Sequence, residues 1–371
     1  MSLRKTLFLV GMLLYSTSVA AQEQILEMAQ RANDYFMKKW EDPTVPTNVG
    51  RIRPSNLWTR AVYYEGLMAL NHVDPQQRYM DYIGKWADFH QWMPRNGVST
   101  TDADDQCCEQ TYIDYHLLTG QGTLEPTKEN LQRQMSSGRD DYWTWIDAIQ
   151  MAMPVYVKMY ALTHERQYLD YALRSYRWTR DSCDSSGLFN KRDGLWWRDK
   201  DYVPPYKEHD GRNCYWSRGN GWVYAALVRC LEQMSPSDEG YHLLKNDFLK
   251  MSEALIQCQH DDGFWGVSLV SPTTYPGPEL TGTSLFLYGL SWGIRHKLLS
   301  EKKFGDACGR AWLALFTCIH DNGFLGWAQG TGKDPSAGQP LGYDKEPNFE
   351  DYVVGCFLLG ATEYYTLNVE H

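Results

Sequence analysis

Several features that would assign this sequence to a common class of protein are missing. It has no block rich in Lys and Arg, and its formal charge is −10, with 36 Lys and Arg against 46 Asp and Glu. Because a nucleic-acid partner requires a basic face, we predict no such partner. Hydrophobic residues make up 43% and charged residues 22%, a globular composition that excludes a disordered or collagen-like chain.

Long apolar runs are also absent, except for a short one at the N-terminus. Arg4 and Lys5 precede an apolar run over residues 7–15 and the small residues 18–20. This run is too short to span a bilayer. We therefore predict a signal peptide over residues 1–20 and an exported mature protein, periplasmic or secreted, without a membrane segment. Its cleavage leaves 34 basic residues against 46 acidic ones, a charge of −12.

Patterns for metal or nucleophilic-serine sites are missing as well. The nine cysteines are an odd number, and Cys230, Cys318 and Cys356 lie in apolar helical patterns where Cys acts as a small buried hydrophobe. No Cys and His residues have zinc-like spacing, and neither H-E-x-x-H nor G-x-S-x-G occurs. We predict no metal, no cofactor and no disulfide framework.

Amphipathic helical periodicity is what the chain has in abundance. Apolar residues recur at steps of three and four, and strand-like alternation is scarce. The pattern predicts about twelve helices, over residues 24–40, 57–71, 76–92, 104–119, 126–135, 142–163, 166–181, 219–234, 240–258, 281–297, 301–319 and 350–367.

The spacing of these helices favours hairpins, because loops of only a few residues join pairs such as 142–163 and 166–181. Six hairpins arrange naturally as a six-fold α/α toroid, with inner and outer helices around one core. No linker divides the chain, so we predict an all-α single domain over residues 21–371. An open α-solenoid of helical repeats is the alternative.

Aromatic residues cluster beside charged ones. The chain has 15 Trp and 25 Tyr, many of them in the strings "DDYWTWIDAIQMAMP", "GLWWRDKDY", "NCYWSRGNGW", "DDGFW" and "NLWTRAVYYEG". Aromatic faces surrounded by hydrogen-bonding groups suit carbohydrate. The clusters indicate a sugar-binding pocket.

Asp147 is the leading candidate for an acid catalyst. It lies among Trp143, Trp145 and other apolar residues, and a carboxyl in such surroundings has a raised pKa that suits proton transfer. A buried Asp that caps a helix or pairs with Arg is the alternative.

A second carboxylate is available in the string "TDADDQCCEQTY". Asp102, Asp104 and Asp105 stand at a predicted helix start, where at least one of them serves as an N-cap. Helix ends that face the mouth of a barrel would place another of these carboxylates opposite Asp147, and paired carboxylates are the usual equipment for glycosidic cleavage.

The string "YWSRGNGW" offers a cation beside aromatic rings. Arg218 and Trp222 lie four residues apart around two glycines, and Trp216 precedes them. A guanidinium on a rigid turn is suited to bind a carboxylate through two hydrogen bonds.

Together these strings resemble glycoside hydrolase family 105, the unsaturated rhamnogalacturonyl hydrolases, which are related to the unsaturated glucuronyl hydrolases of family 88. The resemblance covers essentially the whole mature chain and rests on "DDQCCEQTY", "WIDAIQMAMPVY", "DGLWWRD", "WSRGNGW", "DGFWGVSL", "YPGPELTGTSLF" and "DYVVGCFLLGATEYY". Members are six-fold α/α toroids that remove a terminal 4,5-unsaturated uronic acid from lyase-generated oligosaccharides, by hydration of the C4=C5 double bond and without a metal.

The resemblance also implies roles for individual residues. Asp147 matches the proton donor, and the second aspartate falls in the pair Asp104 and Asp105, of which we prefer Asp105. Arg218 and Trp222 match substrate-binding positions, while Trp58 is a candidate stacking platform. Trp143, Trp216 and Arg198 complete the predicted substrate-binding set.

Arg198 marks a departure, because some family members carry His in that loop and another His where this chain has Arg139. The predicted substrate is an unsaturated galacturonyl or glucuronyl group linked to rhamnose, from rhamnogalacturonan or from ulvan, in which the rhamnose is sulfated. A conventional inverting glycosidase and a non-catalytic sugar-binding toroid are the alternative functions.

Overall fold

The computed structural model describes residues 22–48 and 52–370, and this part of the chain is mainly helical. Eleven numbered helices and a helix over residues 22–39 make twelve within it. The even-numbered helices are α2 (Trp58–Val73), α4 (Ala103–Thr119), α6 (Asp147–Thr163), α8 (Ser217–Leu231), α10 (Leu280–Arg295) and α12 (Asp351–Glu370). The odd-numbered ones are α3 (Gln77–Phe89), α5 (Glu125–Ser136), α7 (Arg166–Asp181), α9 (Tyr241–Cys258) and α11 (Glu301–Phe316).

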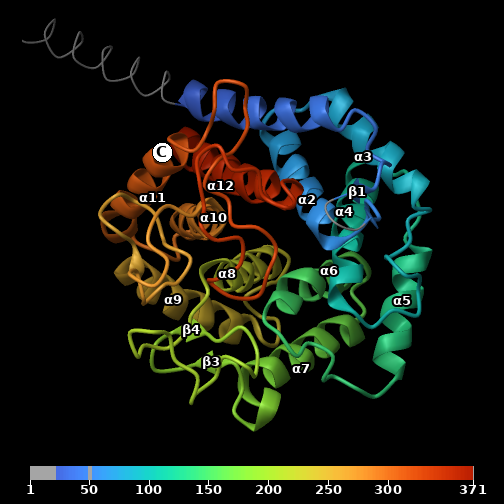
Figure 1. Ribbon diagram of the computed structural model, residues 1–371. Helices are drawn as coiled ribbons and strands as arrows, with labels where there is room; N and C mark the ends of the chain where they lie inside the picture. The colour runs from blue at the N-terminus through green and yellow to red at the C-terminus, as the bar shows by residue number, and fades with distance from the viewer. Residues whose placement is uncertain (1–21, 49–51, 371) are drawn as a thin grey trace, which may run out of the picture.

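The even-numbered helices form a closed inner ring. Each packs against the next, and α12 packs against α2. Figure 1 shows this ring at the centre, with the odd-numbered helices and the helix over residues 22–39 outside it. The predicted six-fold α/α toroid is confirmed, and the alternative of an open solenoid is wrong because the last inner helix meets the first.

Glycines bring α2 and α12 close together where the ring closes. A Cβ atom added at Gly66 would lie 2.6 Å from the Gly355 carbonyl oxygen, and one added at Gly355 would lie 2.2 Å from the Val62 carbonyl oxygen. Both distances are far below van der Waals contact. Any larger residue at either position would therefore force the two helices apart.

The two rings differ in sequence pattern because they differ in burial. Every residue of α8 is buried, whereas α3 buries residues at helical spacing, such as Tyr79, Ile83 and Trp86. An outer helix needs only one apolar face, since its other face meets water. The hydrophobic core therefore lies within the inner ring and between the two rings.

The inner helices are oriented so that the N-terminal ends of α2, α4 and α6 meet at one end of the ring. Trp58, Asp104 and Asp147, near the start of these helices, line one pocket. Residues from the C-terminal halves of all six inner helices line a cavity at the opposite end, among them Val73 and Arg295. The two ends are therefore chemically distinct.

The predicted helices agree with the observed ones apart from small shifts at their ends. The largest difference concerns the helix predicted over residues 142–163, which begins only at Asp147. Trp145 instead forms an antiparallel bridge with Asp199, and the Ile146 amide donates to the Arg198 carbonyl over 2.9 Å. These hydrogen bonds to a distant loop replace the first helical turn.

Short strands are confined to the loops. In the described chain β1 (Thr47–Asn48) pairs with β2 (Ile52–Arg53), and β3 (Phe189–Asn190) pairs with β4 (Leu195–Trp196), both antiparallel. β2 and the segment that follows β4 both reach the pocket.

All nine cysteines lie in the described residues, and none of them forms a disulfide. No described helix combines the length and apolarity that a membrane span requires. The predicted signal peptide, residues 1–20, lies outside the described residues.

Candidate active site

A pocket of about 530 Å³ opens at the end of the ring where α2, α4 and α6 begin. It combines carboxyl groups, guanidinium groups and aromatic or apolar side chains. The lining residues are Ile52, Arg53, Leu57, Trp58, Arg95, Asp102, Asp104, Trp145, Asp147, Met151, Arg198, Thr331 and Gly332.

Asp147, the first residue of α6, reaches this pocket from its floor. The residue is only 8% exposed, and Oδ2 accepts a hydrogen bond from Arg198 Nε over 3.2 Å. Burial raises the pKa of the Asp147 carboxyl, whereas the positive charges of Arg198 and Arg218 lower it, and the net shift is upward. A carboxyl of this kind can hold a proton and donate it. Arg198 then stabilises the carboxylate that remains.

Asp102 and Asp104 share the pocket with Asp147, and Asp104 is the more buried of the two. It lies in the first turn of α4, and its amide donates to the side chain of Asp102, the N-cap residue, over 3.0 Å. Its own carboxyl has no hydrogen bond or ion pair to the described part of the chain. Desolvation, followed by the negative charges of Asp102 and Asp147, raises the pKa of Asp104 to about 8. Asp104 is therefore largely protonated at neutral pH.

Asp105, the preferred second carboxylate from the sequence, does not line the pocket. It is 1% exposed, and its two oxygens accept hydrogen bonds from Arg95 Nη1 (3.0 Å), Asn96 Nδ2 (3.0 Å) and Thr100 Oγ1 (2.6 Å). A carboxylate with three donors is already occupied. The geometry therefore favours Asp104 over Asp105 as the carboxyl that faces a substrate.

Arg198 lies on the pocket wall between two carboxylates. Besides its contact with Asp147, its Nη1 donates to Asp199 Oδ2 over 2.6 Å. The bridge between Trp145 and Asp199 fixes this loop against the segment before α6. Arg198 is thus positioned to stabilise a negative charge on Asp147. The sequence analysis included Arg198 in the predicted substrate-binding set.

The predicted tryptophans divide between the pocket and the core. Trp58 lines the pocket, and its ring contacts the buried Trp222 at a centroid distance of 6.2 Å. Trp143, Trp216 and Trp222 are each 1% exposed or less, and none of them lines the pocket. Trp145 does line it. Trp145 thus takes the place at the pocket that the sequence analysis gave to Trp143.

Arg218 is fully buried behind the pocket. Its Nη1 donates to the Gln329 carbonyl over 3.1 Å and its Nη2 to the Gly330 carbonyl over 2.9 Å. The next two residues, Thr331 and Gly332, form part of the pocket wall. In this structure Arg218 positions the 329–332 segment rather than lining the pocket itself.

The sequence analysis did not select Arg53, Arg95 or Thr331, all of which line the pocket. Arg53 lies on β2 with its guanidinium 4.3 Å from the centre of the Phe349 ring. Of these three residues, only Arg95 could have been recognised from the sequence, because it shortly precedes the acidic cluster at the start of α4. Arg53 and Thr331 come from loops whose position depends on the closed ring.

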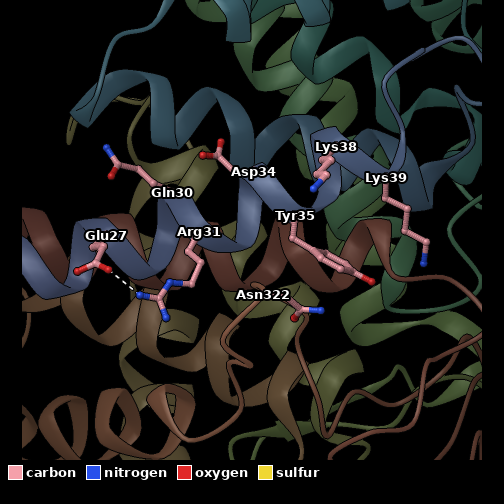
Figure 2. A pocket seen from close by; sticks show the side chains of 8 residues that line it. All are labelled: Glu27, Gln30, Arg31, Asp34, Tyr35, Lys38, Lys39 and Asn322. Carbon is pink, nitrogen blue, oxygen red and sulfur yellow. Dashed lines mark hydrogen bonds and ion pairs between the residues drawn. The ribbon is translucent and has the colours of Figure 1, made fainter.

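A larger groove of about 720 Å³ runs along the helix over residues 22–39, and Figure 2 shows the side chains that line it. Its charges are on the protein surface, where Glu27 and Arg31 form an ion pair over 2.6 Å. No buried carboxyl lines it. The smaller pocket at the end of the ring is therefore the better candidate for catalysis.

Among the described residues, no group of three or more His, Cys, Asp or Glu side chains could hold a metal ion. The candidate site therefore consists of carboxyl, guanidinium and aromatic groups.

Carboxyl groups, guanidinium groups and aromatic rings meet in one pocket at the end of a helical toroid, an arrangement that suits a glycosidase. The comparison with known families agrees. The family described as Glycosyl Hydrolase Family 88 matches residues 28–368, and the chain belongs to this family.

Individual relatives support the same class. The chain is 30% identical over 332 residues to the "Unsaturated 3S-rhamnoglycuronyl hydrolase" of Formosa agariphila, with 84% of each chain covered. A solved structure, "Glycosyl hydrolase family 88 from Bacteroides vulgatus", is 30% identical with a TM-score of 0.84, over 93% of this chain and 99% of the other.

The fold extends to more distant proteins. A possible member of the GH105 family from Salmonella enterica superposes with a TM-score of 0.73 at 19% identity, over 93% of this chain and 94% of the other. The family relationship that the sequence predicted is confirmed by the match to family 88, and the GH105 structure shows a shared fold.

Proposed function

We propose that this glycosidase removes a terminal 4,5-unsaturated uronic acid from oligosaccharides by hydration of the C4=C5 double bond. One observation carries the proposal: Asp104 and Asp147 line the same pocket, and both have raised pKa values. Hydration of a vinyl ether at neutral pH needs a carboxyl that is still protonated when the substrate arrives.

Asp147 acts as the proton donor in the proposed reaction. Its proton passes to C4, positive charge develops on C5 and the ring oxygen, and water adds to C5 with loss of its proton. The resulting hemiketal opens and releases the neighbouring sugar. Arg198 Nε, 3.2 Å from Asp147 Oδ2, stabilises the carboxylate that remains after proton transfer.

Asp104 holds the sugar hydroxyls and the attacking water in this proposal. Its carboxyl is free of partners in the described chain and faces the pocket, which suits a group that must bind ligand atoms. Trp58 offers a partly exposed ring beside it, against which a sugar face can stack.

The proposed substrate contains an unsaturated glucuronyl or galacturonyl group linked to rhamnose, from ulvan or rhamnogalacturonan. The name of the Formosa relative contains a rhamnoglycuronyl unit, which supports a uronyl group linked to rhamnose. We also propose that the protein is exported, to the periplasm or the medium, after cleavage of residues 1–20.

The proposal is tested by incubating the protein with lyase digests of ulvan and of rhamnogalacturonan and following the ultraviolet absorbance of the C4=C5 bond. We expect the absorbance to fall with at least one digest and not with Asp147→Asn. Turnover of saturated oligosaccharides would instead support a conventional inverting glycosidase. Binding without turnover of any of these substrates would support a non-catalytic toroid.

A further inference from the structure

The guanidinium of Arg198 holds its two carboxyl partners unequally. Its Nη1 donates to Asp199 Oδ2 over 2.6 Å, whereas its Nε donates to Asp147 Oδ2 over 3.2 Å. Charge-assisted hydrogen bonds between nitrogen and oxygen are typically about 2.7–2.9 Å long, so the first contact is tight and the second is loose. Asp199 is therefore the stronger partner of Arg198, and Asp147, the proposed proton donor, is the weaker one.

Contacts other than the one with Arg198 fix Asp199 in the fold. Its Oδ1 accepts a hydrogen bond from the Asp201 amide over 2.8 Å, and its carbonyl accepts one from the Tyr202 amide over 3.1 Å. Its backbone forms the antiparallel bridge with Trp145, and its side chain is only 10% exposed. The Asp199 carboxylate therefore lies in a tight turn whose geometry does not depend on the charge of Asp147.

The same turn is attached to a second segment of the chain. Tyr202 Oη donates to Asp334 Oδ2 over 2.7 Å, and the Asp334 carbonyl accepts a hydrogen bond from the side-chain amide of Gln329 over 3.0 Å. The turn is thus held from two sides, by the segment before α6 and by the segment that begins at Gln329.

A cation beside a proton donor has two opposite effects. It stabilises the carboxylate that remains after proton transfer, but it also favours loss of the proton before a substrate arrives. Burial raises the pKa of the Asp147 carboxyl, and the positive charge of Arg198 lowers it. The negative charge of Asp199 raises this pKa again. A second carboxylate on the guanidinium therefore limits the unwanted effect of Arg198 and leaves its contact with Asp147 in place.

We propose that Asp199 is a positioning residue for the proton transfer, because its carboxylate holds the Arg198 guanidinium in one orientation beside Asp147. Asp199 does not line the pocket and acts through Arg198. Without this carboxylate the guanidinium loses its tighter anchor, and the long side chain can take other rotamers. The inference rests on the proposed function, in which Asp147 donates the proton.

The experiment measures the steady-state kinetics of Asp199→Asn with Arg198 present and with Arg198→Gln. Asparagine keeps the size of the side chain and removes its charge. We expect kcat on an unsaturated uronide to fall about 10- to 100-fold with KM within about threefold, because the orientation of Arg198 matters most when the carboxylate of Asp147 forms. In the Arg198→Gln background the same substitution should change kcat by less than about twofold.

Asp201→Asn is the matched control. It removes the same charge from the same turn, but the Asp201 side chain is 57% exposed and pairs with Lys333 over 3.4 Å rather than with Arg198. The kcat of this variant should stay within about twofold of wild type. An equal loss in Asp201→Asn would overturn the inference, because the charge of the turn rather than the contact with Arg198 would then be responsible.

Two results for Asp199→Asn would also overturn the inference. An equal loss in both backgrounds would mean that Asp199 supports the pocket without acting through Arg198. An unchanged kcat would mean that Arg198 needs no such anchor. Should Asp199→Asn not fold, Tyr202→Phe removes only the hydroxyl that holds the turn, and the same two comparisons apply to it with a smaller expected loss.

A crystal structure of the Asp199→Asn protein tests the inference without turnover. The contact between Arg198 Nε and Asp147 Oδ2, 3.2 Å in the wild type, should be lost, and its retention would contradict the proposal. If the wild type turns over no unsaturated uronide, the proposed function itself fails, and this structure alone decides whether Asp199 positions Arg198.

Discussion

Both ends of the helical ring are rich in charge, but the charges are partnered differently. At the end opposite the pocket, a cavity of about 390 Å³ is lined by Asp114, Lys158, Arg229 and Glu65 among others. Asp114 pairs with Lys158, and Arg229 lies 3.7 Å from Glu65 and 3.8 Å from Asp114. At the pocket end the Asp104 carboxyl has no partner in the described chain.

This difference separates stability from function within one fold. Paired charges at the end opposite the pocket tie inner helices α2, α4, α6 and α8 together. At the pocket end, the unpaired carboxyl of Asp104 lies beside Asp147. This arrangement costs stability, because a negative charge on either carboxyl disfavours ionisation of the other. Such a loss of stability is typical of a binding site, because side chains that bind a substrate must be free of other partners.

Helix polarity supports the same division. Asp104 and Asp147 occupy first turns, where the partial positive charge of a helix N-terminus favours a carboxylate. Arg229 and Arg295 occupy last turns, where the partial negative charge favours a cation. These four side chains thus follow the polarity of their helices.

The largest effect is expected when the same substitution is made at the two ends. Asp147→Asn removes the proposed proton donor and should lower kcat about 10²- to 10⁴-fold with little change in Tm. Asp114→Asn should leave kcat unchanged and lower Tm, because it leaves Lys158 without its carboxylate. Steady-state kinetics and thermal unfolding check both. An Asp147→Asn protein that keeps its kcat would remove Asp147 from the mechanism.

Breaking the charge network at the end opposite the pocket should affect stability alone. Arg229→Gln leaves Glu65 without its nearby cation, and loss of one partner from a buried pair costs about 3–5 kcal/mol. The free energy of unfolding in urea measures this loss. Arg133→Gln removes a surface pair with Glu129 and should cost less than about 1 kcal/mol. Equal losses would mean that the network does not hold the ring.

A smaller effect is expected for Asp105, which lies at the pocket end but is fully hydrogen-bonded. Asp105→Asn weakens its contacts with Arg95, Asn96 and Thr100 and should cost about 1–3 kcal/mol of unfolding free energy. The kcat of the folded variant should stay near wild type, whereas Asp104→Asn should lower it. If Asp105→Asn lowered kcat and Asp104→Asn did not, Asp105 rather than Asp104 would be the second catalytic carboxylate.

A further difference concerns the pH dependence of stability. The pKa of Asp104 is about 8 in the folded protein and about 4 when unfolded, so the folded state binds more protons between these values. Wild-type stability should therefore decrease as pH rises from about 4 to about 8. Asp104→Asn removes this slope, and its Tm relative to wild type should increase over that interval. Parallel Tm profiles for the two proteins would contradict the raised pKa.

Loss of the Asp104 proton should also appear in catalysis. If the protonated form is required, kcat/KM should fall as pH rises through about 8. The Asp104→Asn variant should lack this alkaline limb. A limb that persists in the variant would belong to another group.

The sequence analysis and the structure agree on most helices. Only the structure distinguishes between neighbouring residues of the same motif. All predicted helices are observed, and Asp147, Asp104, Trp58 and Arg198 line the pocket. The choice between Asp104 and Asp105 could not be made from spacing, because both lie in one helical turn. Which of the two side chains faces the pocket depends on the loop with Arg95, Asn96 and Thr100, whose side chains bind Asp105.

Trp143 and Arg218 show a related limit. Both belong to motifs that indicate sugar binding, yet Trp143 lies in the core and Arg218 lies beneath the 329–332 segment. A motif identifies the neighbourhood of a site, while contacts with distant segments, such as the bridge between Trp145 and Asp199, decide which side chain of that motif faces the pocket.

By itself, the sequence determined the helical periodicity, the number of hairpins, the family and the carboxyl-rich clusters, because these depend on local pattern. Only the tertiary structure decided which carboxyl is free and which is occupied. That distinction depends on contacts between segments far apart in the chain, such as Arg198 with Asp147 and Arg218 with Gln329. Burial and charge partners, rather than residue type, make Asp104 a candidate for chemistry and Asp105 a support for Arg95.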